Sequence, residues 1–321
     1  MSSGLQVTRP GFFSVLQDLG RNTVAHLGVS SSGVLDSWAA HWANRLCGNA
    51  SYMPLLEIFM GGVEFVATSP TVVCVTGADV KLLINGYQRE CWQSHVVRSG
   101  DLIHIERPSL GVRNYLAVRG GFIAPAILGS VATNFREGIG GFQGQGAPIK
   151  KGDVLPYQPS KARVSLKLEK KFQDWSWFDD VGEASQCMRL IPCAQYYQFP
   201  KQARKSLLQN EYQISPDSNR MGYRLQGDAI EHDISGILSE ATGLGAIQIP
   251  NDGQPIILMQ DRQTLGGYPK LGVICTIDCW RLAQLAPGES VSFKLISITK
   301  AQGFFRRLNH YMKSISPINC S

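Results

Sequence analysis

Short runs of Val, Ile, Leu and Phe recur along the chain, and glycine or proline separates most of them. Runs of this length between turn residues are typical of β-strands joined by tight turns. In the first half, segments 72–76, 80–84 and 115–118 fit strands best, and Asn85-Gly86 is a hairpin signal. The pattern predicts a mainly β protein and argues against an all-helical fold.

Three segments instead favour helices. Residues 37–46 form an Ala-rich amphipathic stretch with Asp36 as N-cap and Gly48 as its stop. A second short helix is expected over 278–285. A third, basic and amphipathic, is expected over 303–313, and we expect its aromatic face to dock on its own domain or on a partner.

With 321 residues and 44% hydrophobic content, the chain is long enough for two domains. Prolines and mixed charges mark a change of composition between residues 152 and 189. We expect an N-terminal β-barrel domain over 1–158, a C-terminal one over 159–300 and a basic tail over 301–321.

The two halves share an order of short motifs. Gln17-Asp18 precedes Asp36-Ser37-Trp38 in the first half, and Gln260-Asp261 precedes Asp278-Cys279-Trp280 in the second. Such an order suggests duplication of one barrel-like unit. Superposition of the halves should then align Asp18 with Asp261.

Charge and cysteine content exclude several classes of function. The 31 basic and 25 acidic residues give a net charge of +6, and the basic residues are scattered, so we expect no nucleic-acid partner. Residues 1–9 lack a signal peptide and no apolar run reaches the roughly 20 residues of a spanning helix, so we expect a cytoplasmic protein without membrane contact. The eight cysteines lie mostly in apolar runs and are expected to be buried thiols, without a metal site at Cys275 and Cys279.

Polar side chains and glycines concentrate in the loops 17–21 and 248–270, which suit a small polar substrate. The alternative is that Asp18 and Asp261 pair with Arg21 and Arg262 merely to fix turns. Two further arginines, four residues apart, either clamp an anion or lie in a solvated surface turn. The candidate catalytic groups are Asp18 and Asp261, and the candidate substrate-binding groups are Gln17, Arg21, Arg220, Arg224, Gln248, Asp252, Arg262, Gln263, Thr264 and Tyr268.

Other catalytic patterns are missing from the sequence. The glycine pairs are not followed by Lys-Ser or Lys-Thr and lack the Rossmann spacing. The Gly-x-Ser-x-Gly pattern of serine hydrolases and a lysine–biotin signature are also missing.

Many of these segments match one family in order over residues 5 to 298. They include Gln17-Asp18-Leu19-Gly20-Arg21, Thr76-Gly77-Ala78-Asp79, Asp252-Gly253-Gln254-Pro255 and Asp261-Arg262-Gln263-Thr264 with Gly266-Gly267-Tyr268-Pro269. The chain resembles the biotin-dependent carboxyltransferase-like family, described as carboxyltransferase subdomain C/D or allophanate hydrolase subunit 2. It departs from the family pattern at Gln145, Cys193-Ala194 and Val34-Leu35.

The resemblance implies a pair of cyclophilin-like β-barrels. Members serve as the C subunit of ATP-dependent 5-oxoprolinase, within the carboxyltransferase of urea carboxylase, or as the partner of a sporulation-kinase inhibitor, so the fold alone does not decide the function.

The leading expectation is a subunit of a hydrolase that opens 5-oxo-L-proline, a small cyclic amide, to L-glutamate. It would require ATP and act only with an A-type subunit and a B-type, allophanate hydrolase subunit 1-like, subunit, one of which would bind the ATP. One alternative is the carboxyltransferase subunit of a urea carboxylase, with biotin carried by another protein. The other is a non-catalytic regulator of a kinase-inhibitor partner.

Overall fold

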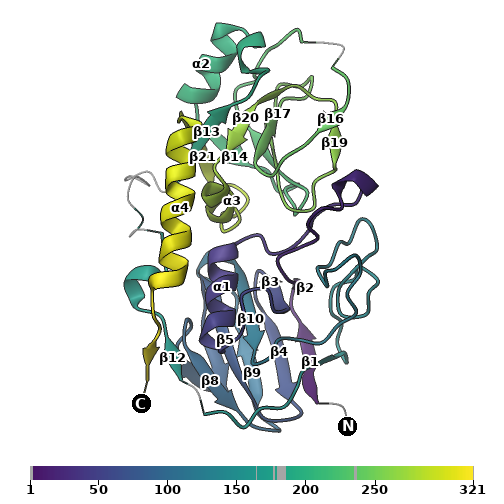
Figure 1. Ribbon diagram of the computed structural model, residues 1–321, viewed down its shortest axis with the longest axis vertical. Coiled ribbons are helices and arrows are strands. Elements are labelled where there is room, and N and C mark those ends of the chain that lie inside the picture. The colour runs from purple at the N-terminus through teal and green to yellow at the C-terminus, as the bar shows by residue number, and fades with distance from the viewer. Residues whose placement is uncertain (1–2, 164, 176–177, 179–185, 235–236, 321) are drawn as a thin grey trace. The chain divides into compact units, whose positions relative to one another are not determined.

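The computed structural model describes residues 3–320 except 164, 176–177, 179–185 and 235–236 (Figure 1). This part of the chain contains 22 strands, most of them short, and four α-helices. The mainly β architecture with a few short helices is therefore confirmed.

Contacts divide the chain into two compact units, each built from separate pieces of sequence. Unit 1 comprises Met1–Arg21, Ser32–Trp177 and Ser316–Ser321, and unit 2 comprises Asn22–Ser31 and Phe178–Ile315. The sequence analysis expected continuous domains and a separate tail. Contacts instead assign 159–177 to unit 1 and 301–315 to unit 2. Each unit also contains a segment distant in sequence, 316–321 in unit 1 and 22–31 in unit 2.

Unit 1 is built from two antiparallel sheets that share one apolar core. The larger sheet has the order β11 (Val154–Pro156), β1 (Gly4–Pro10), β4 (Val63–Ala67), β9 (Leu102–Ile105), β6 (Leu82–Ile84) and β7 (Tyr87–Arg89). The smaller has the order β2 (Phe13–Gln17), β3 (Leu55–Phe59), β10 (Leu110–Val118), β5 (Thr71–Asp79) and β8 (Ser94–Val97). The short strands β12 (Leu166–Lys167) and β22 (Ile318–Asn319) form a separate antiparallel pair.

The strands follow the expected hydrophobic pattern. In β4 buried residues alternate with half-buried ones, whereas most of β5 is buried because α1 packs on it. Asn85 and Gly86 have φ angles of 53° and 80°, which the tight turn between β6 and β7 requires. The expected strands and hairpin are confirmed, with 80–84 shortened to Leu82–Ile84.

Helix α1 (Ser37–Leu46) begins and ends as the sequence predicts. The Asp36 side chain accepts a hydrogen bond from the Ala39 backbone N–H at 3.1 Å, and Gly48 adopts a left-handed conformation after the last turn. Helix α1 packs against β5 and β10, and its Trp38 and Trp42 side chains are buried.

Unit 2 contains a closed seven-stranded barrel. Its strands follow the order β13 (Cys187–Pro192), β20 (Lys270–Ile274), β17 (Ala246–Gln248), β18 (Ile256–Leu258), β15 (Gly222–Gln226), β14 (Tyr212–Ile214) and β21 (Ser290–Leu295). The pair β16 (Glu240–Ala241) and β19 (Leu265–Gly266) lies outside the barrel, as do α2 (Lys201–Gln209), α3 (Thr276–Leu282) and α4 (Ile298–Ser314). The mainly β fold class is thus confirmed, with a closed barrel in unit 2 and two sheets in unit 1.

Two helices of unit 2 differ from their expected bounds. Helix α3 begins at Thr276 and ends at Leu282, earlier than 278–285, because Asp278 lies inside its first turn. Helix α4 begins five residues before 303, since the Ser297 side chain accepts a hydrogen bond from the Lys300 N–H. Phe304 and Leu308 of α4 are buried in unit 2, which confirms docking on its own domain.

The eight cysteines are free thiols, as expected. Among the described residues no group of three or more His, Cys, Asp or Glu side chains is placed to hold a metal ion. Of the helices in the described part, none has the length and apolarity that crossing a bilayer requires.

Candidate functional site

In unit 1, the polar loop after β2 holds a second loop in place. Asp18 Oδ1 accepts hydrogen bonds from the Gly20 N–H at 2.8 Å and the Ser130 hydroxyl at 2.5 Å, and Oδ2 accepts one from the Val131 N–H at 2.9 Å. The buried Arg21 guanidinium donates to carbonyl oxygens of the same loop, at Ile127 (3.0 Å) and Ser130 (3.4 Å).

The neighbouring Gln17 has a similar role. Its amide is fully buried, donates to the Thr133 carbonyl at 3.1 Å and accepts from the Gly33 N–H at 3.1 Å. Gln17, Asp18 and Arg21 therefore come together around residues 127–133. Their hydrogen bonds fix the backbone of this segment.

In unit 2, the central feature is a buried ion pair between Asp261 and Arg220. The Arg220 Nε donates to Asp261 Oδ2 at 2.9 Å and Nη2 donates to Oδ1 at 3.1 Å, and the two residues, Arg220 and Asp261, are 9% and 5% exposed. This planar two-bond geometry fixes the orientation of both side chains. The sequence analysis had considered Arg262 as the partner of Asp261, but the salt bridge that forms is with Arg220.

A segment from the N-terminal half completes this region. Residues 22–31 belong to unit 2, and the buried Ser30 hydroxyl donates to the Arg262 carbonyl at 2.8 Å. The sequence analysis missed this role of Ser30, because its partner is 232 residues away. We call the ion pair, Ser30 and the adjoining residues Arg262, Gln263, Gln248 and Thr242 the Asp261 cluster.

Two glutamine amides form the polar part of the Asp261 cluster. Gln263 Nε2 donates to Gln248 Oε1 at 3.4 Å, and the Thr242 hydroxyl donates to the Gln263 carbonyl. Gln248 is 1% exposed, and its Nε2 has no hydrogen-bond partner in the described part of the chain. A Cβ on Gly266 would lie 2.5 Å from that nitrogen, so a larger residue there would displace the Gln248 amide. A buried N–H group without a partner is costly, and a bound ligand or water would satisfy it.

Arg262 supplies a half-buried positive charge beside these amides. Its Nη1 donates to the Met259 carbonyl at 3.2 Å and its Nε to the Thr242 carbonyl at 3.5 Å. Burial lowers the pKa of Arg262 from its ordinary value, while the nearby Cys279 and Asp261 act in the opposite direction. A guanidinium in this setting is still charged and suits a carboxylate.

Other predicted residues lie apart from the cluster. Arg224 is exposed on β15, so it does not form the expected clamp with the buried Arg220. Asp252 is exposed, and its Oδ1 accepts the Gln254 N–H at 3.0 Å within a turn. Thr264, by contrast, adjoins the cluster, because its carbonyl accepts a hydrogen bond from the Thr242 N–H at 3.0 Å, whereas Tyr268 is 46% exposed.

Two buried networks were not predicted from the sequence. In unit 1, Glu57 accepts hydrogen bonds from the Tyr115 hydroxyl and the Leu35 N–H, both at 2.9 Å, and burial raises the pKa of Tyr115. In unit 2, Asp278 accepts hydrogen bonds from Arg189 at 2.6 and 2.9 Å and from Arg281 at 2.9 Å. In the sequence these acidic residues look like ordinary surface charges, and only the folded structure reveals their buried partners.

The Asp261 cluster suits a small amide better than a nucleoside triphosphate. Arg220 is already paired with Asp261, which leaves Arg262 as the cation of the cluster, and the sequence here has no glycine loop of the phosphate-binding kind. The site therefore combines amide donors and acceptors with one cation.

Comparison with known proteins identifies the family. Residues 27–295 match the model of the carboxyltransferase domain, subdomain A and B. The chain therefore belongs to the carboxyltransferase domain family. This confirms the resemblance seen in the sequence, with subdomains A and B as the matching designation where the sequence analysis named C and D.

Two curated bacterial proteins are similar over nearly their full length. The chain is 34% identical to the C subunit of 5-oxoprolinase from Escherichia coli, over 92% of this chain and 93% of that protein. It is 32% identical to the corresponding 5-oxoprolinase protein of Haemophilus influenzae, over 95% of each. The urea amidolyase of Lachancea kluyveri is 29% identical, but this chain corresponds to only 17% of it.

Solved structures show the same fold within longer chains. The urea carboxylase of Kluyveromyces lactis aligns with a TM-score of 0.87 and 26% identity, over 97% of this chain and 29% of that one. The crystal structure of TTHA0988 aligns with a TM-score of 0.79 and 31% identity, over 91% of this chain and 56% of that one.

Proposed function

We propose that this chain is a subunit of an ATP-dependent 5-oxoprolinase, which opens 5-oxo-L-proline to L-glutamate. The observation that carries the proposal is similarity to two proteins named as the C subunit of 5-oxoprolinase, along more than nine-tenths of both chains. The similarity to urea amidolyase, in contrast, concerns less than a fifth of that protein.

The chemistry of the Asp261 cluster supports a cyclic amide as ligand. The Gln248 N–H, which has no partner among the described residues, is the donor that we assign to the ring carbonyl, and Gln263 offers further amide groups. Arg262 is suited to the carboxylate of 5-oxoproline. Asp261, oriented by Arg220, is the acceptor that we assign to the ring N–H.

The remaining predicted residues receive supporting roles in this proposal. Gln17, Asp18 and Arg21 position the 127–133 loop, because their polar atoms bond to it. Asp18 thus remains a candidate for a role in activity, which it would exert by positioning the 127–133 loop. The exposed Arg224, Asp252 and Tyr268 are available to a partner or to incoming substrate.

Ring opening requires energy from ATP, since the amide bond of an unstrained lactam resists hydrolysis. Transfer of the γ-phosphoryl group of ATP to the ring carbonyl oxygen would activate that carbon for addition of water. Cleavage of the C–N bond would then leave an acyl phosphate, which a second water hydrolyses to glutamate and phosphate. We assign ATP to a partner, because the Asp261 cluster does not fit a triphosphate. The proposed assembly contains an A-type subunit and a B-type, allophanate hydrolase subunit 1-like, subunit, and this chain is active only with them. A cytoplasmic location agrees with its eight free thiols.

Reconstitution tests the proposal. The purified chain is mixed with both partner subunits, and glutamate release from 5-oxoproline is measured with and without ATP. We expect release only when all three proteins and ATP are present. Equal release without this chain, or none from partners that support the homologous bacterial protein, would refute the assignment.

A second function is favoured by the urea carboxylase match, in which nearly all of this chain superposes on the larger enzyme. In that case the chain transfers a carboxyl group from biotin carried by another protein. Avidin would then abolish turnover of urea, whereas it leaves 5-oxoproline cleavage unchanged. A purely regulatory partner would bind tightly without any turnover.

A further inference from the structure

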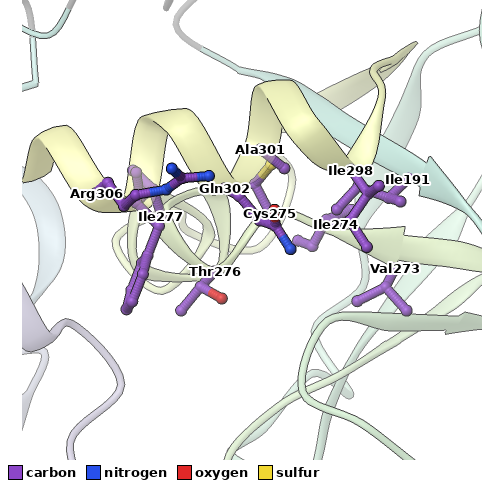
Figure 2. A pocket seen from close by; sticks show the side chains of 11 residues that line it. Ile191, Val273, Ile274, Cys275, Thr276, Ile277, Ile298, Ala301, Gln302 and Arg306 are labelled. Atoms are coloured by element: carbon purple, nitrogen blue, oxygen red, sulfur yellow. The ribbon is translucent and has the colours of Figure 1, made fainter.

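Unit 2 contains a cavity lined by none of the residues of the Asp261 cluster, which we call the α4 groove. Its volume is about 440 Å³. Figure 2 shows Ile191, Val273, Ile274 and Ile298 gathered toward one end and Arg306 at the other. This volume lies within the range of small-molecule sites, and no part of the proposed function uses it.

The lining of the groove is mostly apolar, with Thr276, Gln302 and Arg306 as its polar residues. Aliphatic side chains come from β13, β20 and α4, and Phe305 adds an aromatic ring. Ile298 and Phe305 are 60% and 41% exposed, so apolar surface remains uncovered. Burial raises the pKa of Cys275 to about 12, and its thiol is therefore neutral.

Arg306 is the single cation among the lining residues that the structure describes. It has no salt bridge and no hydrogen bond to any described residue, and none of the described lining residues is acidic. Helix α4 itself carries no Asp or Glu. The groove therefore complements a ligand with an apolar body and one negative group, for which a guanidinium prefers the planar carboxylate.

The backbone around the groove argues against a peptide ligand. β13 is paired with β20 and β21, and β20 is paired with β13 and β17, so neither strand offers a free edge. A peptide could not add as a further strand there. A hydrocarbon chain needs no such hydrogen bonds.

We propose that the α4 groove binds an unbranched aliphatic carboxylate, with its chain over the isoleucines and its carboxylate on Arg306. The backbone rises about 12 Å along α4 between Ile298 and Arg306, which a chain of roughly ten carbons spans. The matched family segment ends at residue 295, before α4 begins. One wall of the groove thus lies outside the segment that defines the family.

Calorimetric titration with decanoate tests this proposal, and decanol serves as the uncharged probe. We expect decanoate to bind the full-length protein, and Arg306→Gln to weaken decanoate binding about tenfold without changing decanol binding. Lys313→Gln, on the same helix but outside the groove, should bind like wild type. Ile298→Glu, at an exposed position that tolerates charge in the folded protein, should abolish decanoate binding.

Three results would overturn the proposal. They are absence of decanoate binding to the wild type, equal weakening by Arg306→Gln and Lys313→Gln, and decanoate binding that survives Ile298→Glu. Each would show that the groove does not recognise this ligand class. The outcome is independent of 5-oxoprolinase activity, which is measured separately.

Discussion

At the scale of single residues, the donors around a carboxylate determine what it does. Asp18 accepts from two backbone N–H groups and a serine, Asp261 from one arginine, and Asp278 from two arginines. The sequence singled out Asp18 and Asp261 by their loops. It could not reveal their partners, because Ser130 is 112 residues from Asp18 and Arg220 is 41 from Asp261.

We predict that Asp278→Asn lowers the free energy of unfolding by about 3–5 kcal/mol, because it leaves two buried guanidinium groups without their counter-charge. The matched variant Asp252→Asn changes an exposed residue whose turn bond an amide also accepts, and should stay within about 0.5 kcal/mol of wild type. Urea unfolding of both variants measures the difference. Equal stabilities would contradict the role given to Asp278.

At the scale of elements, capping residues determine how accurately the ends of a helix can be predicted from the sequence. Helix α1 was predicted to its ends because Asp36 caps it and Gly48 follows it. The start of helix α3 was predicted too late, because Asp278 is a good N-cap by residue type but accepts a hydrogen bond from the Arg189 side chain instead. The true cap of α4, Ser297, lies before an ordinary polar stretch and was overlooked.

Adjacent phenylalanines in α4 provide a matched test of how this helix is held. Phe304 is 2% exposed, while Phe305 is 41% exposed. We predict that Phe304→Ala lowers the free energy of unfolding by about 3–5 kcal/mol. Phe305→Ala should cost less than about 1.5 kcal/mol. Chemical denaturation of the two variants provides the comparison, and a larger loss for Phe305→Ala would mean that the opposite face of α4 is the docked one.

At the scale of the whole molecule, the sequence predicted two barrel-like β domains but not how the chain is shared between them. Periodicity and turn residues are local signals, so strands such as 72–76 and 115–118 could be found directly. The assignment of residues 22–31 to unit 2 and of β22 to unit 1 depends on contacts across more than 150 residues. The proposed duplication remains a prediction, which superposition of the halves will test.

The central claim is that the Asp261 cluster takes part in opening the cyclic amide. Two observations support this claim. The Gln248 amide is buried and its N–H has no partner among the described residues, and the chain is similar along nearly its whole length to 5-oxoprolinase proteins. A structural amide and a ligand-binding amide respond differently to removal. Loss of a structural group destabilises the fold, whereas loss of a ligand-binding group impairs activity at unchanged or higher stability.

The most direct measurement is the rate of ATP-dependent glutamate release by the complete assembly containing Gln248→Leu. We predict at least a tenfold fall in kcat/KM for 5-oxoproline, with a free energy of unfolding equal to or above that of wild type. Lys313→Gln, at an exposed position on α4 outside the cluster, should retain the wild-type rate. A Gln248→Leu assembly that is folded and fully active would contradict the account.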